Sequence, residues 1–113
     1  MDRDAVYLKH ILDAIFLIAK FTKGMNKQDF CDSEITIHAT VRQFEIIGEA
    51  VKHISNTLRD AHPEIPWRSA SGTRDNLIHE YFNVDLDQVW ETIEINLPDF
   101  KDKITKLLSI VLA

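Results

Sequence analysis

The sequence of 113 residues has little that could cross-link or interrupt a chain: one cysteine, three glycines and three prolines. The single Cys31 excludes a disulfide scaffold and a zinc site built from several thiolates. The longest apolar stretches, over 14–19 and over 107–113 with Ser109 inside it, are far shorter than the roughly 20 residues that span a bilayer. Charges at four of the first nine positions exclude a signal peptide. We therefore expect a cytoplasmic protein with no membrane contact.

Positive charge is also scarce, because 13 Lys and Arg stand against 18 Asp and Glu, for a net charge of −5. This balance argues against a general nucleic-acid binder, which is usually basic. The hydrophobic content of 45% and the charged content of 27% are typical of a globular domain and exclude a disordered chain. The length predicts one domain over residues 1–113 with its own core.

Apolar residues recur every three or four positions along most of the chain, which is the pattern of amphipathic helices. The spacing predicts a helix over 4–23, ended by a lysine and Gly24. A second helix is expected from about 32 or 33, where Asp and Ser can cap it, to 61, ahead of Pro63. Residues 25–32 are expected to connect the two.

The second half of the chain shows the same helical pattern with more interruptions. Residues 62–73 are rich in Pro, Ser and Gly and predict a link with one short helical turn. A short helix is expected over 73–82, and a long one begins at an Asp85 cap. Pro98 should split this last helix into two pieces on one face of the core. No stretch alternates with period two, so the predicted fold is all-α, an up-and-down four-helix bundle.

One stretch, residues 73–82, is unusually polar for a helix beside a core. Arg74 carries a planar, permanent cation suited to phosphate, and His79 titrates near neutral pH. A neutral His79 could take the proton from a ribose 2′-hydroxyl while Arg74 stabilises the charge on the phosphate. This chemistry cleaves RNA without a metal ion. The alternative is a solvated helix face with a surface ion pair.

Helix geometry separates this pair, because positions 74 and 79 point about 140° apart on a regular helix. Three arrangements could still join them: a distorted helix start at Gly72, the reach of the long arginine side chain, or a site shared between two subunits. Tyr81, by contrast, projects within about 20° of Arg74.

The whole chain resembles the HepT-like toxins of the HEPN superfamily (higher eukaryotes and prokaryotes nucleotide-binding domains). The family motif is Arg, a polar residue, three variable residues, His, one residue and Tyr, and Arg74, Asp75, His79 and Tyr81 match it. The other similar stretches are Arg3-Asp4, Tyr7-Leu8, Phe44-Glu-Ile-Ile-Gly-Glu-Ala50, Pro63-Glu-Ile-Pro-Trp67 and Val89-Trp90 to Leu97-Pro98.

The resemblance implies an all-α, metal-independent ribonuclease with Arg74 and His79 as the catalytic pair. It implies a homodimer that brings two motifs into one cleft. It further implies a toxin whose partner, a minimal nucleotidyltransferase, neutralises it by transferring AMP to Tyr81. Asp75 is expected to orient His79 or fix Arg74. Glu49 is expected to support the site or a dimer contact, or else to be an ordinary helix carboxylate.

Two further expectations concern cofactors and charge. The five histidines lack ligand spacing, so we expect neither a metal nor another cofactor. If some of Arg42, Lys52, Arg59, Arg68 and Arg74 converge, a small basic site could exist on an acidic body. The alternative function is a non-catalytic nucleotide-binding or antitoxin-type module that regulates the nucleotidyltransferase.

Overall fold

A computed structural model describes residues 2–72 and 85–113. Its helices are α1 (Arg3–Thr22), α2 (Lys27–Asp32), α3 (Glu34–His53), α4 (Asn56–Ala61), α6 (Leu86–Glu91), the π-helical turn η2 (Thr92–Asn96) and α7 (Leu97–Leu112). Residues 67–72 are also helical. Neither described range contains a strand, so the predicted all-α class is confirmed.

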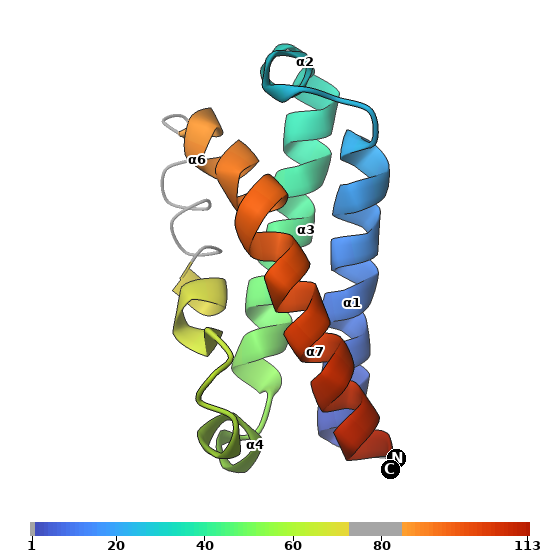
Figure 1. Ribbon diagram of the computed structural model, residues 1–113, viewed down its shortest axis with the longest axis vertical. Helices are drawn as coiled ribbons and strands as arrows, with labels where there is room; N and C mark the ends of the chain where they lie inside the picture. Colours follow the sequence, from blue (N-terminus) through green and yellow to red (C-terminus); the bar gives the residue numbers. More distant parts are fainter. Residues whose placement is uncertain (1, 73–84) are drawn as a thin grey trace.

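The three long helices lie lengthwise beside one another in a body of 42 × 28 × 23 Å (Figure 1). α1 packs against both α3 and α7, which run in the opposite direction to it. The short α2 covers one end and contacts α3 and α6, while α4 lies at the other end. No helix within residues 2–72 and 85–113 is both long enough and apolar enough to cross a membrane.

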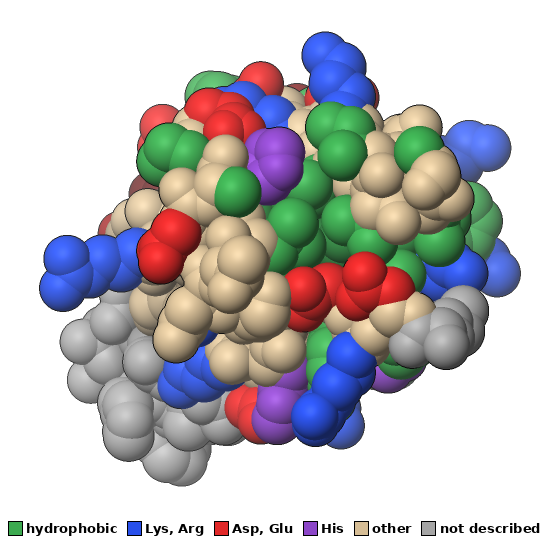
Figure 2. Space-filling view, turned by 90° about the horizontal axis from the view of Figure 1, so that it is seen from below, with side chains coloured by type: hydrophobic (Ala, Val, Ile, Leu, Met, Phe, Trp, Pro, Cys, Tyr) green, Lys and Arg blue, Asp and Glu red, His purple; other side chains and the backbone are tan. Residues whose placement is uncertain are grey.

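The core follows the apolar stripes that the sequence predicts, one from each long helix. Seen from the end that carries α4, apolar side chains gather in the middle and charged side chains of both signs surround them (Figure 2). Burial of these stripes supplies most of the stability of helices that would be marginal alone. The largest fully buried side chains are Leu8, Ile11, Ile18, Phe30, Ile54, Ile104, Leu107, Val51 and Thr40.

The first helix ends as its sequence predicts. α1 stops at Thr22 with Lys23 as its C-cap, and Gly24 has a φ of +76°. This left-handed conformation is the one that glycine adopts without a steric penalty. The Asp2 side chain accepts a hydrogen bond from the Asp4 backbone N–H at 2.8 Å and caps the other end.

The prediction of a plain connector over 25–32 is wrong, because Lys27–Asp32 forms α2. A capping box starts this helix: Asn26 Oδ1 accepts from the Asp29 N–H at 2.8 Å, and Asp29 Oδ2 accepts from the Asn26 N–H at 3.1 Å. The Phe30 ring is fully buried and anchors the helix to the core. Six residues are too few for a hydrophobic period to show in the sequence.

The single helix predicted up to residue 61 is also wrong, because the chain breaks between α3 and α4. Asp4, in the first turn of α1, holds the break. Its carboxylate accepts hydrogen bonds from the Ser55 N–H at 2.8 Å and from the Ser55 hydroxyl at 2.6 Å. The Ser55 hydroxyl oxygen also accepts from the Leu58 N–H at 3.2 Å and so caps α4. The predicted end at Ala61 is confirmed.

Replacing Asp4 with alanine is therefore expected to lower the free energy of unfolding by about 1–2 kcal/mol, because two charge-assisted hydrogen bonds are lost. Urea denaturation followed by circular dichroism measures the change. Asp13→Ala, on the exposed side of the same helix, is the matched control and should stay within about 0.5 kcal/mol of the parent. Equal losses in the two variants would contradict the role given to Asp4.

The last helix is divided near Pro98, as predicted, and the division is a π-helical turn. Asp85 caps α6 by accepting from the Gln88 N–H at 3.2 Å, and η2 then occupies Thr92–Asn96. Pro98 lies in the first turn of α7, where its missing N–H does not interrupt a regular helix. The apolar stripe crosses this division, since Val89 before it and Leu97 after it are both buried.

Candidate functional site

The four motif residues, Arg74, Asp75, His79 and Tyr81, lie outside the described residues, as does the short helix expected over 73–82. Their predicted roles stay predictions. The structure describes the segments that precede and follow the motif in the sequence, and it shows how each is held.

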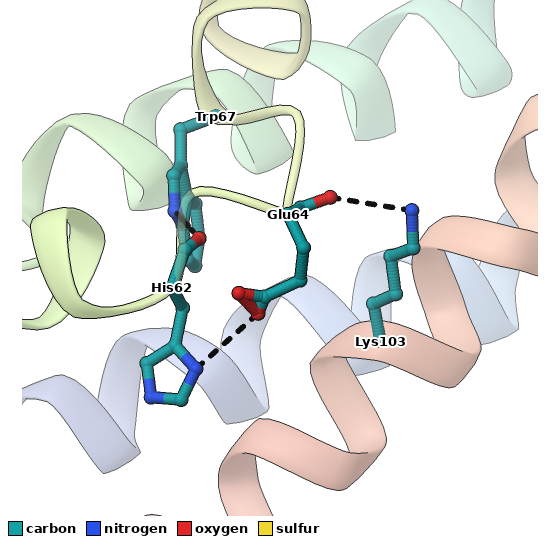
Figure 3. Close-up of polar contacts among 4 residues, drawn as sticks. All are labelled: His62, Glu64, Trp67 and Lys103. Atoms are coloured by element: carbon teal, nitrogen blue, oxygen red, sulfur yellow. Dashed lines mark hydrogen bonds and ion pairs between the residues drawn. The ribbon is translucent and has the colours of Figure 1, made fainter.

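The preceding segment is fixed by a buried tryptophan. The predicted helical turn after Pro66 is confirmed over residues 67–72, and the Ala70 N–H donates to the Pro66 carbonyl at 3.1 Å. Trp67 is only 8% exposed, and its Nε1–H donates to the His62 carbonyl oxygen at 3.1 Å (Figure 3). A large buried ring whose indole N–H has a hydrogen-bond acceptor holds its segment firmly against the core. Trp67 is therefore a core residue.

A lysine of α7 forms a second contact with the segment that precedes the motif. Lys103 Nζ donates to the Glu64 backbone carbonyl at 3.3 Å and forms an ion pair with Asp99 at 3.1 Å. The Glu64 carboxylate lies 3.3 Å from His62 Nδ1 (Figure 3). The lysine and the glutamate are 39 residues apart, so no sequence pattern indicated this contact.

The segment after the motif is held by α2. Lys27 Nζ lies 2.8 Å from Asp87 Oδ1, and the rings of Phe30 and Trp90 are 5.4 Å apart. The hydrogen bond and the negative charge of Asp87 raise the pKa of Lys27. The ion pair is exposed and contributes little by itself. The buried ring of Phe30 therefore does most to fix α6.

A groove of about 880 Å³ lies between these two segments. Its described floor is apolar and includes Phe44 and Ile47 of α3. Its edges carry carboxylates and no basic side chain among the described residues. The acidic lining residues are Asp85, Asp87, Glu91 and Asp99.

Glu49 occupies a different groove, of about 410 Å³, between α1 and α3. Its Oε1 lies 3.3 Å from His53 Nε2, and the His53 ring stacks on Tyr7 with a centroid separation of 4.9 Å. Arg42 lines the same groove and pairs with Glu45 at 3.3 Å. Glu49 lines neither of the grooves formed by residues 66–72, so its supporting role stays a prediction.

The described basic residues do not all converge. Arg59 and Arg68 line one groove, whereas Arg42 faces the groove of Glu49. Within residues 2–72 and 85–113, no group of three or more His, Cys, Asp or Glu side chains is arranged to hold a metal ion.

Comparison with known proteins gives one consistent match. The family model described as ribonuclease HepT-like matches residues 11–107. A protein of Thermococcus cleftensis named as a probable ribonuclease HepT is 46% identical over 101 residues, which cover 89% of this chain and 92% of that protein. A protein of Caldanaerobacter subterraneus with an RNase name is 39% identical, over 90% of this chain and 91% of its own length.

In one relative the matching region is only about half of the protein. A protein of Methanocaldococcus jannaschii, named for gamma-glutamylcyclotransferase and RNase, is 40% identical over 91% of this chain but only 46% of its own length. No solved structure gives a significant match.

Proposed function

The chain belongs to the ribonuclease HepT-like family, and we propose that it is a metal-independent endoribonuclease that uses Arg74 and His79. One observation carries the proposal: the Arg74-x4-His79-x-Tyr81 motif falls within the matched residues 11–107. Buried side chains anchor the segments on either side of the motif: Trp67 lies in the preceding segment, and Phe30 of α2 packs against Trp90 in the following one.

The proposed reaction is an internal transfer within the RNA strand. Neutral His79 takes the 2′-hydroxyl proton, and the 2′-oxygen attacks the adjacent phosphorus. The bond from phosphorus to the 5′-oxygen breaks, and that oxygen leaves with a proton from a second imidazolium. The products are a 2′,3′-cyclic phosphate and a 5′-hydroxyl. Arg74 binds the phosphate oxygens, where negative charge accumulates in the transition state.

A homodimer is part of this proposal. Two chains would supply the second histidine and would bring together groups that point about 140° apart on one regular helix. RNA is the substrate class, transfer or messenger RNA, and its cleavage site is open to experiment.

Cleavage of total RNA and of transfer RNA by the purified protein tests the function. The parent should cleave, and the Arg74→Ala/His79→Ala double variant should not. A double variant that cleaves as fast as the parent would exclude the proposed site.

The alternative, a non-catalytic module that regulates a partner enzyme, is favoured by the net charge of −5 and by the acidic edges of the groove between residues 66–70 and α6. A growth assay in cells that express the protein distinguishes the two functions. Expression of this chain alone should arrest growth if it is a ribonuclease toxin, and should not if it is a regulatory module.

Neutralisation is proposed to occur at Tyr81: a cognate minimal nucleotidyltransferase transfers AMP from ATP to the tyrosine oxygen, which loses its proton, and pyrophosphate leaves. A phosphodiester beside Arg74 would occupy its cation and block the substrate. Intact-mass measurement after co-expression should show a fixed increment for each AMP, and Tyr81→Phe should remove it. Tyr7→Phe, in the groove of Glu49, is the matched control and should keep the increment. If the Tyr81→Phe variant still gains the mass of AMP, another residue is the acceptor.

A further inference from the structure

A groove of about 880 Å³ runs between α4 and the residues that lead to the motif. We call it the Arg59–Arg68 groove. Its volume lies within the roughly 300–1,000 Å³ of typical ligand clefts. The polar residues that matter here are Asn56, Arg59, Asp60, Arg68 and Ser71, and Gly72 lines it as well.

Among the described residues, no carboxylate neutralises the two guanidinium groups in this groove. No carboxylate of the described chain lies within ion-pair distance of Arg59 or Arg68, although Asp60 shares the groove. Arg59 instead donates to the amide oxygen of Asn56, a neutral group. By contrast, Arg42 is paired with Glu45 at 3.3 Å. The Arg59–Arg68 groove is therefore a locally cationic surface on an acidic protein.

The local fold turns these side chains outward. Trp67 is buried in the core, and Arg68, the next residue along the helical turn, is exposed. Arg68 and Ser71 are three residues apart and so share one face of this turn. Arg59 approaches from α4, whose position is set by the Ser55 cap. Two separate elements thus present their donors to one groove.

The two sides of residues 66–72 differ sharply in charge. The groove towards α6 and α7 carries four carboxylates, two of which are paired with Lys27 and Lys103, and no basic side chain among its described lining. The described lining of the Arg59–Arg68 groove carries two guanidinium groups and one carboxylate. A polyanion that reaches this part of the molecule is repelled from the first groove and attracted to the second.

We propose that the Arg59–Arg68 groove binds the phosphate backbone of the RNA strand next to the cleaved bond. The inference rests on the proposed ribonuclease function and adds the path of its substrate. Gly72, at the edge of the groove, precedes Arg74 by two residues, and two residues of extended chain span at most about 7 Å. A strand bound there would reach the motif within a short length of backbone.

The side chains of the groove favour contact with the sugar-phosphate backbone of the RNA over contact with its bases. Arginine forks, a serine hydroxyl and an amide are the groups that bind phosphate and sugar oxygens. The one aromatic side chain in the described lining, Trp67, is buried and offers no ring face on which a base could stack. Binding should therefore tolerate many sequences and depend strongly on salt.

The test measures binding separately from cleavage. The probe is a short, mixed-sequence 2′-O-methyl RNA strand, which lacks the attacking hydroxyl, and its fluorescence anisotropy is followed across a salt series. Arg59→Ala/Arg68→Ala is compared with Lys101→Ala/Lys106→Ala, which removes the same charge from exposed positions on α7. Arg59→Lys/Arg68→Lys restores the charge without the fork.

The arginine-to-alanine pair should bind at least tenfold more weakly at low salt. Its slope of log affinity against log salt should shrink by about 1.4, which is 0.7 for each lost phosphate contact. The lysine-for-arginine pair should recover the slope, and the α7 control should match the parent. On cleavable RNA, KM should rise more than kcat falls.

Several results would overturn the groove proposal. They are an unchanged slope in the arginine-to-alanine pair, an equal loss in the α7 control, and a parent that does not bind the probe. A variant that binds RNA normally but escapes AMP transfer would assign the groove to the partner enzyme instead. If the parent cleaves RNA and the slopes do not differ, only the groove proposal fails. If the parent binds through the groove but never cleaves, only the ribonuclease function fails.

Discussion

Replacement of His79 with alanine is expected to slow RNA cleavage by about 10²- to 10⁴-fold, the usual contribution of a positioned general base. The imidazole must be neutral to accept the 2′-hydroxyl proton. Cleavage by the parent should therefore decline in acid, where the imidazole is protonated, and this dependence should disappear in the variant. The measurement is the single-turnover rate on a labelled RNA strand across a pH series.

The arginine of the pair should show a different signature. Arg74→Ala is expected to cost about 10²- to 10³-fold, and Arg74→Lys should recover part of the loss, because a lysine supplies the charge without the planar fork. The double variant should be little slower than the worse single variant, since groups that act in one step are not additive.

A second histidine serves as the control for both changes. His38→Ala, beside Glu34 near the start of α3, removes an imidazole that is half exposed and should leave the cleavage rate unchanged. All variants should keep the parent's circular dichroism spectrum and unfolding midpoint. Parental rates in both His79→Ala and Arg74→Ala would contradict the motif assignment.

Replacement of Phe30 with alanine is expected to lower the free energy of unfolding by about 3–5 kcal/mol. The ring is fully buried, and it packs against Trp90 and so joins α2 to α6. A loss of this size is a large part of the 5–15 kcal/mol typical of a domain. Cleavage should fall as well, because α6 follows the motif directly.

The control for Phe30 is Phe16, a phenylalanine on α1 whose side chain is 65% exposed. Phe16→Ala removes the same atoms and should change the unfolding free energy by at most about 0.5 kcal/mol. If Phe30→Ala does not fold, Phe30→Leu keeps most of the volume and should cost about 1–2 kcal/mol. Urea denaturation measures all three, and equal effects at positions 30 and 16 would contradict the anchoring role.

Local pattern was sufficient to predict the long helices and several of their ends. The stripes of α1 and α7 repeat with the helical period over 20 and 16 residues, so one face of each had to be buried. Gly24 marked the end of the first helix, Asp85 the start of the last one, and Pro98 its division. Each of these residues acts through its own backbone or on a neighbour within one helical turn. The family motif identified the candidate site, and its four residues lie outside the part of the chain that the structure describes.

By itself, then, the sequence determined the all-α class, the long helices and the motif, because these depend on residues close together in the chain. The tertiary structure decided where α3 ends, since the partner of Ser55 is Asp4, 51 residues away. It decided that α2 forms, because a six-residue helix needs the buried contact of Phe30. It also brought Arg59 and Arg68 into one groove and left Arg42 in another, because the bends at residues 54–55 and 62–66 set which side chains meet.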